Sequence, residues 1–356
     1  MTLRIVHVAS GREWRGGQRQ VWLLARALAK RAGVVQTVVT GRGSQLARRL
    51  AADGVATVTP TWNGAFSFRA LLATVRAGGR ATIFHAHDSH ALTLAGLASL
   101  ITGAHLVGTR RVDFPLRRAG FWRRADRVIA ISEAVEAALI AGGVPPSRIA
   151  LVHSGIAVDE LARTTPHDPR PGLGLPAGTP IAITTGALVR HKDHPTLIRA
   201  AHIASASRPD LHWVIAGEGH LRGHLEALIA ELDLGNRVHL LGEVPDAARL
   251  VAASDLFVMS SVKEGLGTAV LDAMALGIPV VGTKAGGIPE LLGGGAGLLV
   301  SPQDPGALAS AVVGLLANPA TRADQVARAL VAVRRYGDER MADGVLQVYR
   351  SITSAQ

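Results

Sequence analysis

The sequence predicts an α/β protein of two domains, each a doubly wound parallel sheet covered by helices. Short apolar, often β-branched runs alternate with amphipathic stretches, which is the pattern of such a sheet. The alternation occurs in two series, separated by a segment rich in proline and glycine. The chain has 356 residues, more than one hydrophobic core usually serves.

The first series begins near the N-terminus and predicts the first domain. Its opening strand is followed by a helix, because Val21, Leu24, Ala25 and Leu28 recur at helical spacing. The strands of this series are expected at residues 3–8, 34–40, 81–86, 105–109, 127–131 and 149–152.

The second series predicts another sheet of the same kind. Its strands are expected at Ile181–Thr185, His212–Ala216, Val238–Leu240, Leu256–Ser260 and Pro279–Thr283. Between the two series, residues 164–180 read as a linker about which the domains would close. We therefore expect domains at 1–168 and 169–335, and a C-terminal helix at 336–356 that packs back on the first domain. Ligands should bind at the strand C-termini that face the cleft between the domains.

Composition restricts the chemistry. There are no cysteines, so disulfides and thiolate metal sites are excluded, and no His-x-x-x-His or dense carboxylate cluster indicates a metal. We expect no cofactor and no metal. The N-terminus lacks the basic-then-apolar order of a signal peptide, and no apolar run is long enough to span a bilayer. A cytoplasmic protein is expected.

The positive charge lies in the first half of the chain and predicts an anionic partner there. Residues 1–165 carry 22 basic against 9 acidic side chains, whereas residues 166–356 carry 16 against 18. One segment resembles an interfacial patch, which suggests an anionic membrane surface on the cytoplasmic face of the inner membrane. It contains Arg110, Arg111, Arg117, Arg118, Arg123 and Arg124, interleaved with Phe114, Phe121 and Trp122. Nucleic acid is disfavoured as a partner, because aromatic residues make up only 4% of the chain and no binding signature occurs.

Residues 264–274 place one carboxylate in a glycine loop and another in the helix expected after it. Amides at a helix N-terminus attract phosphate, and Gly265 and Gly267 let the backbone approach a ligand closely. Glu264 would face one end of that ligand. Asp272 lies four residues beyond Thr268, about one helical turn or ~6 Å along the axis, and could accept hydroxyl hydrogen bonds. Two carboxylates that accept hydrogen bonds from hydroxyls, beside backbone amides that bind a diphosphate, predict a site for a sugar nucleotide.

The segment around this loop resembles a known family. Residues 255–290 are similar to the signature of the retaining glycosyltransferases of family 4, which have the architecture called GT-B. Shorter similar segments follow in the family's order: Gly16-Gly17, Ile129–Ser132, Gly186–Lys192, Ala216–Gly219 and Leu241–Pro245. The resemblance implies two doubly wound Rossmann-like domains facing each other across a cleft. The first would bind the acceptor and the second the nucleotide-sugar donor.

The resemblance also implies roles for single residues. Glu264 would bind the sugar, Asp272 the ribose and Lys192 the diphosphate. Three residues would serve catalysis: Glu264, Lys192 and His87. The donor site would comprise Gly16, Gly17, Arg190, Lys192, Glu218, Glu264, Gly265, Leu266, Gly267, Thr268, Ala269, Asp272 and Glu290.

Two departures from the family pattern concern the donor site. The family has a second glutamate where this chain has Asp272, and an arginine where it has Ala187. Arg190 is an unmatched substitute for that arginine.

The expected function is transfer of a hexosyl or heptosyl unit from a nucleoside-diphosphate sugar to a hydroxyl of a cell-envelope glycan or lipid-linked acceptor, as in lipopolysaccharide synthesis, with retained anomeric configuration. A nucleotide-sugar 2-epimerase of the same architecture and a non-catalytic sugar-nucleotide binder stay open as alternatives. A dinucleotide-binding oxidoreductase is disfavoured, because no Gly-x-Gly-x-x-Gly follows the first strand.

Overall fold

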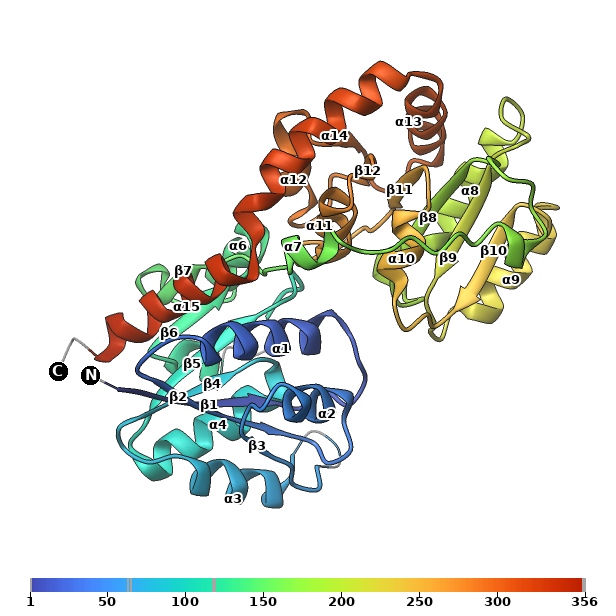
Figure 1. The fold of residues 1–356 in the computed structure, drawn as a ribbon. Helices are drawn as coiled ribbons and strands as arrows, with labels where there is room; N and C mark the ends of the chain where they lie inside the picture. The colour runs from blue at the N-terminus through green and yellow to red at the C-terminus, as the bar shows by residue number, and fades with distance from the viewer. Residues whose placement is uncertain (1, 63, 65, 117–119, 354–356) are drawn as a thin grey trace. The chain divides into compact units, whose positions relative to one another are not determined.

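The chain forms two compact units, and each contains its own sheet (Figure 1). A computed structural model describes residues 2–62, 64, 66–116 and 120–353. The first unit comprises the residues up to Ile156 together with those from Tyr336 onward, and the second unit comprises Ala157–Arg335. The first unit is therefore built from two separate stretches of chain.

The first unit is a parallel seven-stranded sheet with the order β3-β2-β1-β4-β5-β6-β7. Its strands are β1 (Leu3–Ala9), β2 (Val34–Thr40), β3 (Thr57–Val58), β4 (Thr82–Ala86), β5 (His105–Arg110), β6 (Arg127–Ala130) and β7 (Ile149–Leu151). Its helices are α1 (Gly16–Ala29), α2 (Gln45–Ala52), α3 (Phe68–Ala77), α4 (Ser89–Thr102), α5 (Gly120–Arg124), α6 (Glu133–Ala141) and α15 (Asp338–Thr353). The strand order reverses between β1 and β4, so a ligand site is expected at their carboxyl ends.

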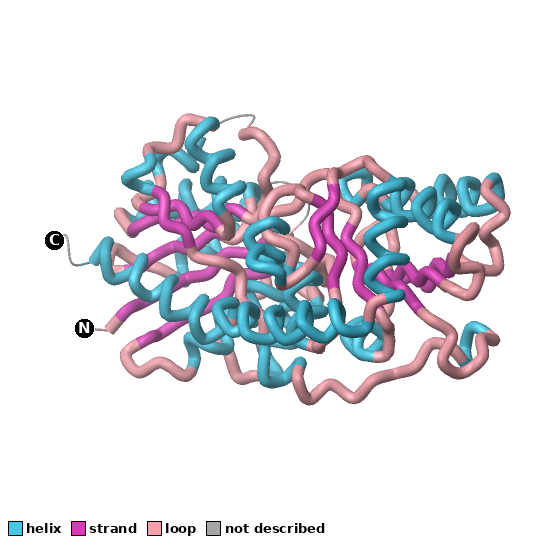
Figure 2. The backbone as a smooth tube through the Cα atoms, turned by 90° about the horizontal axis from the view of Figure 1, so that it is seen from above, coloured by secondary structure: helices cyan, strands magenta, loops and turns pink. Residues whose placement is uncertain are grey.

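The second unit is a parallel six-stranded sheet with the order β10-β9-β8-β11-β12-β13, with helices around its strands (Figure 2). Its strands are β8 (Ile181–Thr185), β9 (His212–Ala216), β10 (Val238–Gly242), β11 (Leu256–Met259), β12 (Val280–Thr283) and β13 (Leu298–Val300). Its helices are α7 (Val158–Leu161), α8 (His194–Ala204), α9 (Arg222–Glu231), α10 (Ala247–Ala252), α11 (Thr268–Ala275), α12 (Ile288–Leu292), α13 (Pro305–Ala317) and α14 (Pro319–Val333). Here the order reverses between β8 and β11.

The predicted doubly wound architecture is confirmed in both units. The core strands are almost completely buried, as continuous apolar runs in parallel sheets should be. Two strands, β3 and β13, were not predicted. Both form sheet edges and are very short, and their runs, Thr57-Val58 and Leu298–Val300, are too brief to show a period.

The segment 164–180 is tied to the second unit, so the chain leaves the first unit earlier than residue 168. Arg170 is buried, and its guanidinium donates to the carbonyl oxygens of Thr179 (2.7 Å) and Ala253 (3.0 Å) and to Asp255 (2.7 Å). The amide of His167 also donates to Arg249 O (2.9 Å). These contacts make the expected linker a fixed part of its domain.

Helix α15 completes the first unit. It packs against α1, where Arg26 pairs with Asp338 (3.4 Å), Lys30 with Glu339 (3.0 Å) and Arg31 with Asp343 (2.8 Å). Its Tyr349 is completely buried. The chain returns to this unit beside its point of departure, because the amide of Ile156 donates to Tyr336 O and the amide of Asp338 to Ile156 O, both at 2.9 Å.

Candidate functional site

Lys192 and Glu264 meet at the point of the second sheet where the strand order reverses. Lys192 follows β8, and Glu264 follows the neighbouring strand β11. The distance from Lys192 Nζ to Glu264 Oε2 is 2.5 Å, and the side chains are 17% and 15% exposed. Ser261 Oγ lies 3.3 Å from the same carboxylate oxygen. The structure thus places a cation and an anion, 72 residues apart in sequence, in one partly buried pair.

Glycines permit the backbone around this pair to pack without side chains. A Cβ on Gly286, which has φ +51°, would lie 1.6 Å from Glu264 O. The next amide, that of Gly287, donates to Glu264 O (3.1 Å). On the other side, a Cβ on Gly217 would lie 1.8 Å from Gly186 O. Neither position can carry a larger residue without movement of the neighbouring loop.

Helix α11 begins directly after the glycine loop, and no side chain caps its N-terminus. Gly267 is its N-cap, with φ +97°, no side-chain cap is present and the first turn contains no acidic residue. Thr268 and Ala269 are partly exposed, whereas Gly265 and Leu266 are buried, so the Leu266 side chain belongs to the core. Asp272 is partly exposed, one turn further along the helix.

The other residues expected at the donor site have varied surroundings. Arg190 is exposed, and its guanidinium has neither a hydrogen bond nor an ion pair among the described residues, whereas its carbonyl oxygen accepts from Asp193 N (3.2 Å). Glu218 is paired with Arg222 (2.6 Å), four residues later, and its side chain is 45% exposed. Glu290 lies in the first turn of α12 and is partly buried. Ser261 was not predicted, because nothing in the local sequence shows that it would face Glu264.

In the first unit, Gly16 and Gly17 form the start of α1. Arg15 precedes them as the N-cap and provides no side-chain cap, and the first turn has no acidic residue. The amides at this helix end therefore carry partial positive charge that no side chain of the helix neutralises. Because α1 follows β1, this end lies where the first sheet reverses its strand order.

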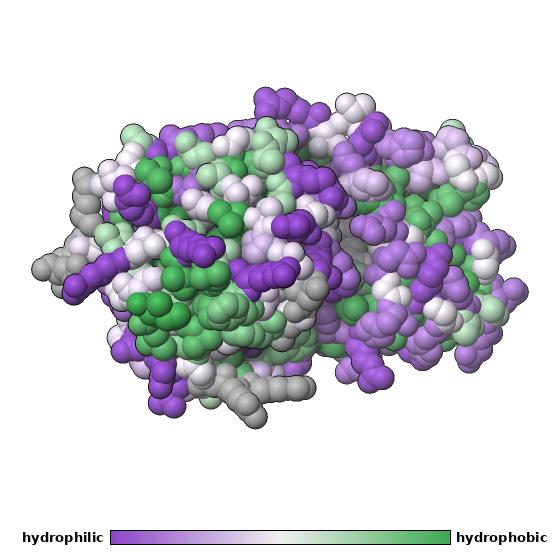
Figure 3. Space-filling view, turned by 90° about the horizontal axis from the view of Figure 1, so that it is seen from below, coloured by the Kyte–Doolittle hydropathy of each residue, from purple (hydrophilic) through white to green (hydrophobic). Residues whose placement is uncertain are grey.

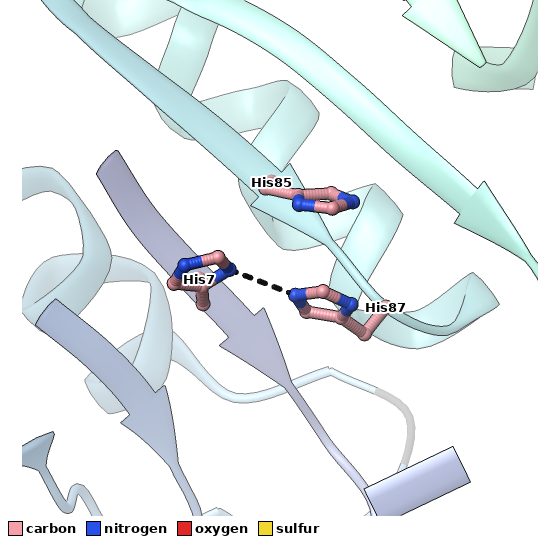
Figure 4. A group of neighbouring side chains, drawn as sticks. All are labelled: His7, His85 and His87. Carbon is pink, nitrogen blue, oxygen red and sulfur yellow. Dashed lines mark hydrogen bonds between the residues drawn. The ribbon is translucent and has the colours of Figure 1, made fainter. Parts of the chain in front are cut away.

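His87 belongs to a buried cluster with His7 and His85 (Figure 4). His7 Nδ1 lies 3.0 Å from His87 Nε2, and Arg111 Nη2 lies 3.2 Å from His87 Nδ1. His85 is held by Tyr349 OH at Nδ1 (2.5 Å) and by Thr109 Oγ1 at Nε2 (2.7 Å). His87 is only 4% exposed, and both of its ring nitrogens are engaged.

The protonation of this cluster argues against a metal, although ligand atoms of the three rings lie within 4.8 Å of one another. A guanidinium can only donate, so His87 Nδ1 accepts from Arg111, and we assign the ring proton to Nε2, which donates to His7. A metal at His87 Nε2 would require that proton on Nδ1, against the Arg111 donor. The cluster fits a neutral hydrogen-bond network.

We expect the stability of the protein to fall in acid because of these histidines. Burial lowers the pKa of His7 to about 4, and burial, with nearby positive groups, lowers the pKa of His85 and His87 well below the usual value. The unfolded chain takes up these protons near pH 6.5, so the free energy of unfolding should decrease between about pH 6.5 and 4, by up to ~1.4 kcal/mol per pH unit for each ring. Urea unfolding at pH 7.5, 6 and 5 measures the slope.

His7→Gln should flatten that slope, whereas substitution of the exposed His90 by Gln should leave it unchanged. Equal slopes in both variants would show that the buried cluster does not control the acid response.

The expected arginine patch is only partly on the surface. Arg110 and Trp122 are each 5% exposed, and the Arg110 guanidinium donates to Phe114 O and lies 5.6 Å from the centre of the Trp122 ring. These residues are therefore part of the fold, because a cation stacked on a buried indole is shielded from solvent. Arg123 and Arg124 on α5 are exposed, whereas Arg117 and Arg118 lie outside the described residues.

Fold and site together define an α/β protein with a helix N-terminus that lacks a side-chain cap at each of two topological switch points. The family model of the glycosyl transferases group 1 matches residues 168–330, and that of glycosyltransferase family 4 matches residues 14–160. The chain therefore belongs to the glycosyltransferases of family 4 and has the GT-B fold.

Known proteins resemble the chain to different extents. D-inositol 3-phosphate glycosyltransferase 2 of Catenulispora acidiphila is 31% identical over 75% of the chain and 65% of its own length. The lipopolysaccharide core biosynthesis glycosyltransferase LpsE of Rhizobium meliloti is 32% identical over 51% of the chain and 53% of its own length. The chain thus spans about half to two thirds of these relatives. Anabaena HepE, solved with UDP-glucose, has a TM-score of 0.86 at 22% identity, covering 99% of this chain and all of that one.

Proposed function

We propose that the protein transfers a glycosyl unit from a nucleoside-diphosphate sugar to an acceptor hydroxyl, with retention at the anomeric carbon. The observation that carries this proposal is the Lys192–Glu264 pair beside the uncapped N-terminus of α11. One charge suits a diphosphate and the other suits sugar hydroxyls. Family membership and the UDP-glucose complex of HepE support the same ligand class.

In this proposal the leaving diphosphate receives its stabilisation from the protein. Lys192 pairs with the phosphate oxygens, with Arg190 as a second cation, and the amides of Gly267, Thr268 and Ala269 add the dipole of α11. This positive charge stabilises the transition state more than the ground state, because the diphosphate gains negative charge as its bond to the sugar breaks. We propose that it serves in place of a metal ion.

Glu264 holds the sugar in this mechanism, and Asp272 holds the ribose one helical turn away. A phosphate oxygen of the leaving group takes the proton of the acceptor hydroxyl on the same face of the sugar, which yields retention without an enzymic nucleophile. Gly265 and Leu266 shape the loop, Glu218 follows β9, and Glu290 lies in the first turn of α12. Gly16 and Gly17, at the start of α1, are the donor-binding residues that we propose for the first unit.

The acceptor is proposed to be a cell-envelope glycan or a lipid-linked glycan. Two relatives, an inositol phosphate glycosyltransferase and a lipopolysaccharide core glycosyltransferase, support a polyhydroxylated acceptor. We place the reaction on the cytoplasmic face of the membrane, with lipopolysaccharide synthesis as one setting. Among the described residues, no helix has both the length and the apolar character to cross a bilayer.

Contact with an anionic bilayer is proposed for the face formed by α3, α4 and α5. Apolar side chains gather there in the view from below (Figure 3), and the exposed ones include Phe68 on α3 and Leu100 and Ile101 on α4. Exposed arginines lie on the same elements. They are Arg69 and Arg76 on α3 and Arg123 and Arg124 on α5. Apolar insertion combined with basic residues is the mode of interfacial proteins.

Replacing Arg123 and Arg124 together by Gln should weaken binding to vesicles that contain phosphatidylglycerol. The loss should be about fivefold per charge at low salt, since each basic residue near the surface contributes about 1 kcal/mol, and it should shrink at 0.5 M salt. Sedimentation with vesicles measures it. Replacing Arg322 and Arg328 by Gln in the other unit is the matched control, and equal partitioning of all three proteins would contradict the proposed face.

A thermal-shift screen against UDP-, GDP- and ADP-sugars identifies the donor. A donor at 100 times its dissociation constant adds about 2.7 kcal/mol of stability. Incubation of the selected donor without acceptor then separates the alternatives. Conversion to a second nucleotide sugar would indicate the 2-epimerase, and binding without transfer to any glycan acceptor would indicate a non-catalytic binder.

A further inference from the structure

Arg111, directly after β5, is a cation without a carboxylate partner among the described residues. Its Nη2 donates to His87 Nδ1, and its buried Nε has no hydrogen-bond partner. Asp88 is near enough to raise the pKa of this arginine, but its carboxylate accepts from Ser10 N (2.8 Å), Ser10 Oγ (2.6 Å) and Ala91 N (2.8 Å). A shielded guanidinium of this kind is costly unless an anion completes it.

The same arginine lies beside the start of α1. A Cβ on Gly17 would be 3.8 Å from Arg111 Cδ. At this helix end neither the N-cap Arg15 nor the first turn supplies a negative or capping group. The side-chain cation and the helix amides therefore act on the same region, from two elements that are distant in sequence.

His87 explains the orientation of Arg111. The ring accepts from the guanidinium through Nδ1 and donates to His7 through Nε2, so it has no hydrogen-bonding capacity left for a ligand. Arg111 does have capacity left, because its hydrogen bond to His87 engages only Nη2 of a guanidinium that has five N–H donors. The arginine is therefore the residue that can contact a ligand, and the histidine holds the arginine in position. The sequence instead predicts the histidine as the functional residue.

We propose that Arg111, with the amides of Gly16 and Gly17, binds a phosphate group, and that His87 positions the guanidinium. The inference rests on the proposed function for one point only, namely which phosphate it is. The diphosphate of the donor and a phosphate on the acceptor have the chemistry that a guanidinium and a helix N-terminus recognise.

The test uses inorganic phosphate as the probe, in the Lys192→Met background so that the second unit contributes little. Phosphate should raise the melting temperature of that protein. Arg111→Gln should abolish the rise while its melting temperature without phosphate stays equal to or above that of the parent, because an uncompensated cation has been removed. Arg111→Lys should keep part of the rise. Arg80→Gln, at an exposed arginine that precedes β4, is the control and should keep all of it.

Two results would overturn the inference: no effect of phosphate on the parent, or an undiminished effect in Arg111→Gln. A purely structural arginine would instead lower the melting temperature of Arg111→Gln equally with and without phosphate, which also counts against it.

Calorimetry with UDP, GDP and ADP on the protein with native Lys192 identifies the source. A loss of affinity of about tenfold or more in Arg111→Gln assigns the donor diphosphate. Unchanged nucleotide affinity, with the phosphate effect lost, assigns an acceptor phosphate. If no nucleotide binds but the phosphate effect still depends on Arg111, the proposed function fails and the anion site stands.

Discussion

Lys192→Ala is expected to lower the turnover of glycosyl transfer by about 10²–10³-fold, because one group that stabilises the leaving diphosphate is lost. The change should appear mainly in kcat, since the charge it opposes develops as the glycosidic bond breaks. Steady-state kinetics with the selected donor measure it. Lys284→Ala, on an exposed lysine of the same unit, is the control and should behave as the parent.

A double variant separates this role from a merely structural ion pair. Lys192→Met alone leaves the Glu264 carboxylate, 15% exposed, without its partner, so part of any loss could come from an unpaired charge. Lys192→Met combined with Glu264→Gln removes both charges and should restore stability. If it also restored transfer, the pair would only hold the loops together, and our assignment of the site would be wrong.

Gly286→Ala is expected to reduce transfer by at least about 10²-fold, because a catalytic residue displaced by about 1 Å loses that much. The new Cβ would lie 1.6 Å from Glu264 O, and φ +51° already disfavours a side chain. The loop that carries Glu264 must therefore move. Kinetics combined with thermal unfolding measure the two effects.

Gly314→Ala is the matched control on a glycine of the same unit. It lies in α13, nothing is within 4 Å of its Cβ position, and alanine should stabilise this helix by about 0.5–1 kcal/mol. If Gly286→Ala transferred sugar as well as Gly314→Ala does, the packing of Gly286 on Glu264 would have no bearing on the site.

The architecture could be predicted from the sequence because burial on both faces gives each core strand a continuous apolar run. The loop of Glu264 and the open end of α11 could be predicted as well, since their residues are neighbours in the chain. The resemblance assigns Lys192 and Glu264 to one donor site. The contact between them could not be predicted from a local pattern, because it depends on the pairing of β8 with β11.

The arginines show where sequence reasoning fails. Arg110, Arg111 and Arg124 look equivalent in the chain, yet the structure stacks the first on Trp122, joins the second to His87 and leaves the third exposed. Which arginine faces solvent depends on the end of β5 and the direction in which the following loop leaves it. The spacing of the arginines along the chain does not indicate that direction.

Because α15 belongs to the first unit, the order of synthesis and the order of folding cannot coincide. When the ribosome has made the first 156 residues, the sheet of that unit still lacks Tyr349, the partner of His85, and the acidic residues that face α1. The second unit is continuous in sequence and can fold while the first waits. N-terminal domains usually fold first during synthesis, but here the second unit can complete its packing before the first. A chain that ends at Arg335 should therefore contain a complete second unit and an incomplete first one.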